Sequence, residues 1–213
     1  VGPLAKIAHA ARQADTPASL RGILAQLADQ GGVLQRNLVD AALATLDRKD
    51  RHALHHMGIV VGTLDLFIPS ILKPEPSRVR LALLAVRADV PMPPLPLAGL
   101  GLLDKPAPAL AAAAHQAGYR RFGDQMLRVD LVEKIARAAH DARGKDRTAI
   151  LNPALATSLG VGNATLGRIM RALGFLPAGS APGHGWRWRG RPRRAERQTP
   201  VNAAFAALSQ LKR

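Results

Sequence analysis

The sequence predicts a mainly α-helical protein that ends in a winged-helix domain and a basic tail. Alanine and leucine supply most of the apolar content, since only seven of the 213 residues are Phe, Trp or Tyr, and this composition favours helices. A helix-turn-helix pattern covers residues 152–175. It is followed by Trp186-Arg187-Trp188-Arg189, whose apolar and basic alternation predicts a strand with arginines facing outward.

The helix-turn-helix prediction rests on apolar residues at helical spacing on both sides of a turn that contains Gly160 and Asn163. Gly160 allows the left-handed backbone that a sharp helix end needs, and Asn163 is expected to cap the second helix with its side chain. Apolar residues three and four positions apart predict the inner face of each helix: Leu155, Ala156 and Leu159 in the first, and Leu166, Ile169, Met170 and Leu173 in the second. The second helix of such a motif can enter a nucleic-acid groove.

A helix over Leu127–Arg143 is expected to complete the three-helix part of this domain, with one inner face formed by Leu127, Leu131, Ile135 and Ala138. The predicted nucleic-acid contacts are polar and basic residues of the second helix, the strand and the tail: Asn163, Thr165, Arg168, Arg171, Arg187, Arg189, Arg191, Arg193 and Arg194. The alternative is a packing module, in which the second helix is buried against the rest of a larger assembly.

Charge agrees with a polyanionic partner. Thirty Lys and Arg oppose fifteen Asp and Glu, a formal charge of +15, which attracts RNA, DNA or an anionic membrane. Residues 186–213 hold eight of these cations and one acid. Without cysteine, disulfides and thiol catalysis are excluded. No apolar run long enough for a membrane span and no signal-peptide layout is present, so we expect a cytoplasmic protein without a membrane partner. The first residue is Val1, which suggests a processed product or a fragment.

Four regions are predicted along the chain: a helical accessory domain over 1–90, a proline-rich linker over 91–116, the winged-helix domain over 117–190 and a basic tail over 191–213. In the first region we expect helices at Asn37–Leu46, His52–Met57 and Ser77–Arg87, a short strand within Gly58–Pro69, and one helix whose apolar stripe is Leu20, Ile23, Leu24 and Leu27. In the tail, Thr199–Leu211 is predicted to be an amphipathic helix with Phe205 on its apolar side, which could dock on a protein partner.

Other candidate chemistry is weak. His52, His55 and His56 could approach one metal ion on a helix, but no fourth ligand is fixed, so ordinary histidines are the preferred interpretation. Asp65 lies in an apolar run and is either a buried acid with a shifted pKa or a hydrogen-bonding residue at a strand end. The sequence shows no hydrolase signature.

Two segments resemble a known family. Gly58–Arg87 (GIVVGTLDLFIPSILKPEPSRVRLALLAVR) and Phe122–Arg143 (FGDQMLRVDLVEKIARAAHDAR) are similar to the C-terminal region of alpha-proteobacterial relatives of the mitochondrial degradosome helicase, a superfamily-two DExH-box enzyme. With the helix-turn-helix and the closing Phe205-Ala206-Ala207-Leu208, the resemblance covers most of the chain. It implies ATP-driven unwinding of RNA or of DNA–RNA duplexes, magnesium-ATP as cofactor, and RNA turnover as the setting.

The chain departs from that family in lacking its motor. It has neither the G-x-x-x-x-G-K-[ST] phosphate loop nor the acidic DExH segment, so this chain alone is expected to bind no cofactor and to hydrolyse no ATP. The prediction is the accessory region of an ATP-dependent helicase whose motor domains lie upstream. This region is expected to bind RNA, the favoured ligand, or DNA. The alternatives are a protein-interaction scaffold of the same helicase and a free-standing winged-helix regulator that binds DNA.

Overall fold

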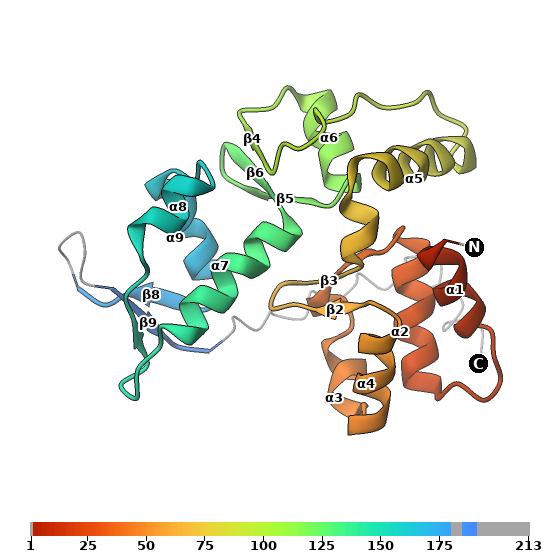
Figure 1. Cartoon of the computed structure of the whole chain (residues 1–213), viewed down its shortest axis with the longest axis horizontal. Helices are drawn as coiled ribbons and strands as arrows, with labels where there is room; N and C mark the ends of the chain where they lie inside the picture. The colour runs from red at the N-terminus through yellow and green to blue at the C-terminus, as the bar shows by residue number, and fades with distance from the viewer. Residues whose placement is uncertain (1, 180–184, 191–213) are drawn as a thin grey trace, which may run out of the picture.

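The computed structural model describes residues 2–179 and 185–190 and shows a protein of mixed helices and small antiparallel sheets (Figure 1). The fold is more mixed than the predicted mainly α class: helices are the commonest element, but the described residues also hold three sheets of three strands each. The amphipathic helix predicted at Thr199–Leu211 lies outside the described residues.

The first unit packs four helices around a small sheet. Its elements are α1 (Pro3–Ala10), α2 (Ala18–Asp29), β1 (Val33–Gln35), η1 (Arg36–Leu38), α3 (Asp40–Thr45), α4 (Arg48–His56), β2 (Val60–Val61), β3 (Asp65–Phe67) and η2 (Pro69–Leu72). The predicted stripe of α2 is confirmed, since its four apolar residues are buried in one core with Leu34, Leu54 and Leu66.

Two predictions in this unit need correction. The helix expected at Asn37–Leu46 is divided into η1 and α3, because buried Val39 has φ −127° and takes the backbone out of helical geometry between them. The single strand expected within Gly58–Pro69 is instead a hairpin of β2 and β3.

The second unit contains α5 (Pro74–Arg87), β4 (Leu102–Asp104), α6 (Pro108–Gln116), β5 (Tyr119–Phe122) and β6 (Gln125–Arg128). The prolines expected to precede α5 lie in its first turn, where a missing N–H is harmless. The stretch 91–116, predicted as a linker, holds both β4 and α6, and a buried cluster includes Leu103, Ala111 and Ala114. Within this stretch, residues 91–101 and 105–107 lie outside helices and strands.

The third unit contains α7 (Val129–Asp141), β7 (Thr148–Ala149), α8 (Pro153–Ser158), α9 (Asn163–Ala172), β8 (Phe175–Pro177) and β9 (Trp186–Trp188). The inner face of α7 is not the predicted one: its buried residues are Val129, Val132, Ile135, Ala136 and Ala139. Of the predicted set, only Ile135 is a buried residue of α7. Leu127 is buried but belongs to β6, and Leu131 and Ala138 are only half-buried.

The three units share one topology. Each places a helix before its first strand, one or two helices after it, and a hairpin at its end. The strand order is β1-β3-β2, β4-β6-β5 and β7-β9-β8, so the last strand lies in the middle of every sheet and pairs antiparallel on both sides. The chain thus repeats one supersecondary arrangement three times.

Buried polar contacts join the units. From α5, Arg80 donates to the Gly31 carbonyl at 2.8 Å and to the Gln116 carbonyl at 2.6 Å, which ties the end of α2 to the end of α6. Burial lowers the pKa of Arg80 to about 10. The backbone N–H of Thr63, in the β2–β3 turn, donates to Glu133 of α7 at 2.6 Å, which ties the first unit to the third.

Candidate nucleic-acid interface

The two predicted helices are α8 and α9, with a tight turn between them, but the predicted cap of the second helix does not form. Asn152 caps α8 by accepting from the Ala154 N–H at 2.9 Å. Gly160 has φ +67°, the left-handed geometry that the turn requires. Asn163 is an exposed first residue of α9 and caps nothing, so that prediction is wrong. Gly162 holds the cap position, and its N–H is instead bound by the side chain of Gln125 at 3.2 Å.

The burial of α9 confirms its predicted inner stripe. Ile169, Met170 and Leu173 are fully buried in the core of the third unit, and Leu166 packs at its edge. Thr165 belongs to the same side and is 4% exposed, so the prediction that it contacts nucleic acid is wrong. Outward-facing residues of the helix are Asn163, Ala164, Arg168 and Arg171.

Part of this outer face meets the second unit. The Arg168 guanidinium lies against Gly123 in the β5–β6 turn, so closely that a Cβ at Gly123 would collide with it. Arg121 donates to the carbonyl of the same glycine at 3.0 Å, and Gln125 also donates to the Gly160 carbonyl at 3.4 Å. The β5–β6 hairpin therefore contacts α9 at Arg168 and at its cap residue Gly162, and Arg171 is the outer cation of α9 without such a contact.

Strand β9 has the predicted alternation. Arg187 is exposed, while Trp186 and Trp188 are half-buried and pack against the core of the third unit. The guanidinium carbon of Arg143, at the end of α7, lies 4.4 Å from the centre of the Trp188 ring, a cation–π contact. Arg189 is exposed too. The predicted contacts Arg191, Arg193 and Arg194 lie outside the described residues.

Next to this strand, three rings pack together: those of His140, Phe175 and Trp188. The His140 ring lies 5.1 Å from Phe175 and 5.8 Å from Trp188, measured between ring centres. Burial lowers the pKa of His140 below its ordinary value, and the positive charge of Arg143 lowers it further. The imidazole is therefore a neutral support for β9 at neutral pH, and Arg143 supplies the charge at this edge.

Gly167 connects the two arginine-bearing elements. A Cβ at this position would lie 3.8 Å from both the Arg171 guanidinium and the Trp186 ring, so the outer face of α9 adjoins β9 at Gly167. Gly167 and Ala164 are small residues, so nothing bulky projects from this part of the outer face of α9. A phosphate backbone or another surface could approach the helix closely here, between Arg171 and Arg187.

Replacing Gly167 with Ala is expected to raise the free energy of unfolding by about 0.5–1 kcal/mol, because glycine inside a helix has more backbone freedom to lose. The space admits a methyl group at ordinary contact distance. Urea unfolding of parent and variant measures the change. Gly160→Ala is the matched comparison: its φ of +67° is strained for alanine, so that variant should be less stable than the parent.

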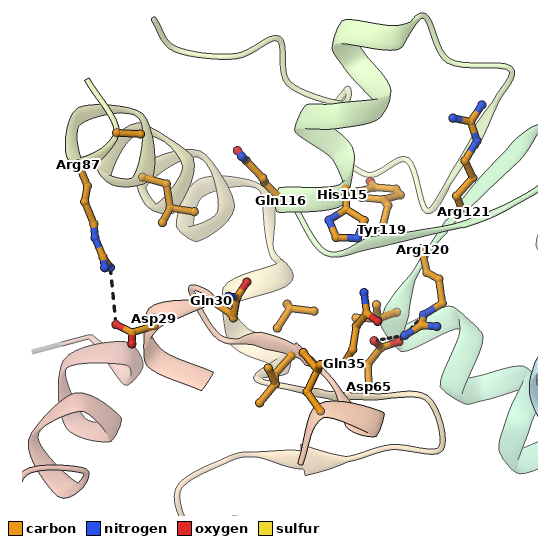
Figure 2. A pocket seen from close by; sticks show the side chains of 16 residues that line it. Asp29, Gln30, Gln35, Asp65, Arg87, His115, Gln116, Tyr119, Arg120 and Arg121 are labelled. Atoms are coloured by element: carbon orange, nitrogen blue, oxygen red, sulfur yellow. Dashed lines mark hydrogen bonds and ion pairs between the residues drawn. The ribbon is translucent and has the colours of Figure 1, made fainter. Parts of the chain in front are cut away.

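A separate cleft of about 650 Å³ lies between the end of α2, β1, α5, α6 and β5 (Figure 2). Gln30 and Gln116 come from the ends of α2 and α6, and Arg87 meets Asp29 at 3.7 Å at its rim. None of the predicted nucleic-acid contacts within the described residues lines it. The lining of the cleft is mixed, since Val33, Leu34 and Leu84 lie among its polar and charged residues.

Asp65 lies at one end of this cleft and is a buried acid, as one of the two interpretations proposed. Its side chain is 6% exposed and accepts from Arg120 at 2.7 and 3.0 Å in a bidentate ion pair (Figure 2). Burial raises the pKa of Asp65 above its ordinary value and outweighs the opposing effect of Arg120. The pair connects β3 of the first unit to β5 of the second, so its place in the fold is structural.

The histidines of α4 are exposed, and His52 and His56 pack edge to face with ring centres 4.3 Å apart. Within residues 2–179 and 185–190, no group of three or more His, Asp or Glu side chains is arranged to hold a metal ion. Across the same residues, every helix is too short or too polar to span a bilayer.

Residues of the second unit that sequence reasoning missed, Arg121 and Gln125, contribute to the surface around α9. Nothing in their local pattern points to α9, because only the pairing of distant strands brings the β5–β6 turn to it. Comparison of the chain with models of known protein families, with curated proteins and with solved structures gives no match.

Proposed function

We propose that the third unit is a winged helix that binds nucleic acid, and that the chain is the accessory region of an ATP-dependent helicase whose motor domains lie upstream. The element order α7, β7, α8, α9, β8, β9 and the strand order β7-β9-β8 support the first part. In this arrangement α9 takes the place of the groove-facing helix. The antiparallel pair of β8 and β9 takes the place of the wing strands.

The observation that carries the binding proposal is the meeting of α9 and β9 at Gly167. Arg171 and Arg187 project from two adjoining elements and are exposed. Arg189 follows at the end of β9, and six of the eight cations of residues 186–213 lie beyond it in the tail. Such cations contact phosphates, which gives affinity with strong salt dependence and little sequence preference.

The second unit engages part of the outer face of α9: Gln125 binds the Gly162 N–H, and Arg168 lies against Gly123. The exposed cations that remain, Arg171, Arg187 and Arg189, are suited to phosphates. Binding of the nucleic-acid backbone is therefore the proposed mode. RNA is the proposed ligand because the resemblance of Gly58–Arg87 and Phe122–Arg143 implies a helicase of RNA turnover, which also gives the cytoplasmic setting and a magnesium-ATP requirement for the parent enzyme.

One specific observation favours a second candidate, the scaffold. Arg168 and Gln125 join α9 to the second unit of the same chain, and the Phe205 segment of the tail is predicted from sequence to dock on a protein partner. In that case the exposed arginines keep the units or neighbouring subunits together, and removal of Arg171 and Arg187 changes stability rather than RNA affinity.

Replacing Arg171 and Arg187 together with Ala is expected to weaken binding of a structured RNA. The slope of log affinity against log salt should become shallower by about one unit for each lost phosphate contact. Fluorescence anisotropy across a salt series measures both quantities. The free energy of unfolding should remain within about 0.5 kcal/mol of the parent, because both side chains are exposed.

The matched control is Lys6→Ala with Arg12→Ala, which removes two exposed cations at the opposite end of the described chain and should leave the slope unchanged. Equal slopes for the parent and the Arg171 and Arg187 variant would contradict the proposed interface. If that variant also melts earlier than the parent, the scaffold is the better description.

A further inference from the structure

The helix that precedes the hairpin ends in the same way in all three units. Gly58, Gly118 and Gly174 follow α4, α6 and α9 with φ of +74°, +91° and +90°. Each glycine N–H donates to the carbonyl three residues earlier, at 2.9, 3.2 and 3.0 Å. The residue after each glycine is buried: Ile59, Tyr119 and Phe175. These three helices therefore occupy equivalent places.

Aligning the units on these glycines relates α4 to α9 residue by residue. Leu54 then matches Met170, and both are 0% exposed, so the two helices turn the same side inward. On the outer side, His52 and His55 match Arg168 and Arg171. Arg48 matches Ala164. The face of α4 that corresponds to the proposed RNA-binding face of α9 is thus basic and exposed.

The basic face of α4 is dense and accessible. Only Leu54 of this helix is buried, while its other long side chains, apart from half-buried Asp50, are exposed: Arg48, Lys49, Arg51, His52, His55 and His56. Among the described residues, no carboxylate forms an ion pair with Arg48, Lys49 or Arg51. The equivalent helix α6 is mostly alanine and has His115 as its one basic side chain, so this charge is a property of α4 and not of the repeat.

A cleft continues this face toward the third unit. It has a volume of about 890 Å³, lies between α3, α4, β2 and α7, and is lined by Arg36, Arg51, His55 and Arg137 with Asp40 as the acid. Arg51 is fixed there, because it donates to the Leu43 and Leu46 carbonyls at 3.0 and 3.2 Å. In Figure 1, α7 runs between the α3–α4 pair and the sheet of β8 and β9.

We propose that α4 is a second RNA-contacting helix, and that one RNA strand or duplex runs from Arg187 along α7, past Arg137, to Arg48 and Lys49. This inference rests on the proposed function of the third unit and adds a second point of contact to it. Two separated phosphate contacts on one chain raise the affinity for a long RNA over a short one, because the second contact forms within the complex.

Replacing Arg48 and Lys49 together with Ala is expected to reduce the salt slope for a long RNA by about 1.4–1.8 units, about 0.7–0.9 for each contact. For an RNA too short to reach α4 while it is bound to the third unit, the salt slope should not change. Lys6→Ala with Arg12→Ala is the control of equal charge. Chemical acetylation gives a direct readout, since long RNA should protect Lys49 several-fold and leave Lys6 reactive.

The outcomes separate this inference from the proposed function. If the Arg171 and Arg187 variant loses affinity while the Arg48 and Lys49 variant does not, and Lys49 is unprotected, α4 is no contact and the winged-helix proposal stands. If only the α4 variant loses affinity, the second contact stands and the proposal for the third unit is overturned. Equal acetylation of Lys49 with and without long RNA would overturn the α4 site, whichever variant loses affinity.

Discussion

Replacing Ile169 with Asp is expected to unfold the third unit. Ile169 is 0% exposed and packs in the core that unites α7, α8, α9 and β8. An aspartate there would place an unpaired charge in an apolar interior, with an expected loss of at least about 4 kcal/mol, beyond what most single substitutions cause. Circular dichroism during thermal unfolding measures the loss.

Two controls distinguish buried charge from a change of charge or volume. Ile169→Val removes one methyl group and should lower stability by about 0.5–1.5 kcal/mol. Ala164→Asp puts the same charge on the exposed side of the first turn of α9, where a carboxylate is favourable, and should leave the fold intact. If Ile169→Asp melts like the parent, the inner face of α9 is not packed as described.

The parts of this fold that could be predicted from sequence are those set by neighbours along the chain. The α8–α9 pair depends on helical spacing and on Gly160, and the strand at Trp186 depends on simple alternation. The buried face of a helix is harder to predict. For α7, two apolar stripes overlap in the sequence, and its packing against α8, α9 and β8 decides which one is buried, so the predicted face is mostly wrong.

Contacts between distant segments could not be predicted. Strand β4 has three residues and pairs with β6, where Leu102 lies opposite Leu127, and nothing local in the proline-rich stretch 91–108 points to that partner. The triple repeat was also missed, because its units share little beyond a helix-ending glycine and a buried apolar residue after it. Thr165 shows the same limit: polar residues of α9 were assigned to the ligand, although one faces the core.

Removing Asp65 is expected to have the second-largest effect on stability. Asp65→Ala leaves the Arg120 guanidinium without its bidentate partner between β3 and β5. Breaking a buried pair by deleting one partner is destabilising by about 3–5 kcal/mol. Because the Arg120 side chain is still 25% exposed, we expect the lower end, about 3 kcal/mol, measured as a shift in the urea midpoint at constant m-value.

A second ion pair of the same cleft provides the comparison. Asp29 and Arg87 meet at 3.7 Å with both side chains 70% exposed, so Asp29→Ala should change stability by less than about 0.5 kcal/mol. Replacing both buried partners, Asp65→Leu with Arg120→Met, should recover most of the loss, since an apolar pair needs no compensating charge. A single Asp65→Ala variant as stable as the parent would mean that water replaces the carboxylate. Arg120 would then not depend on Asp65, and the pair would not be what joins the first two units.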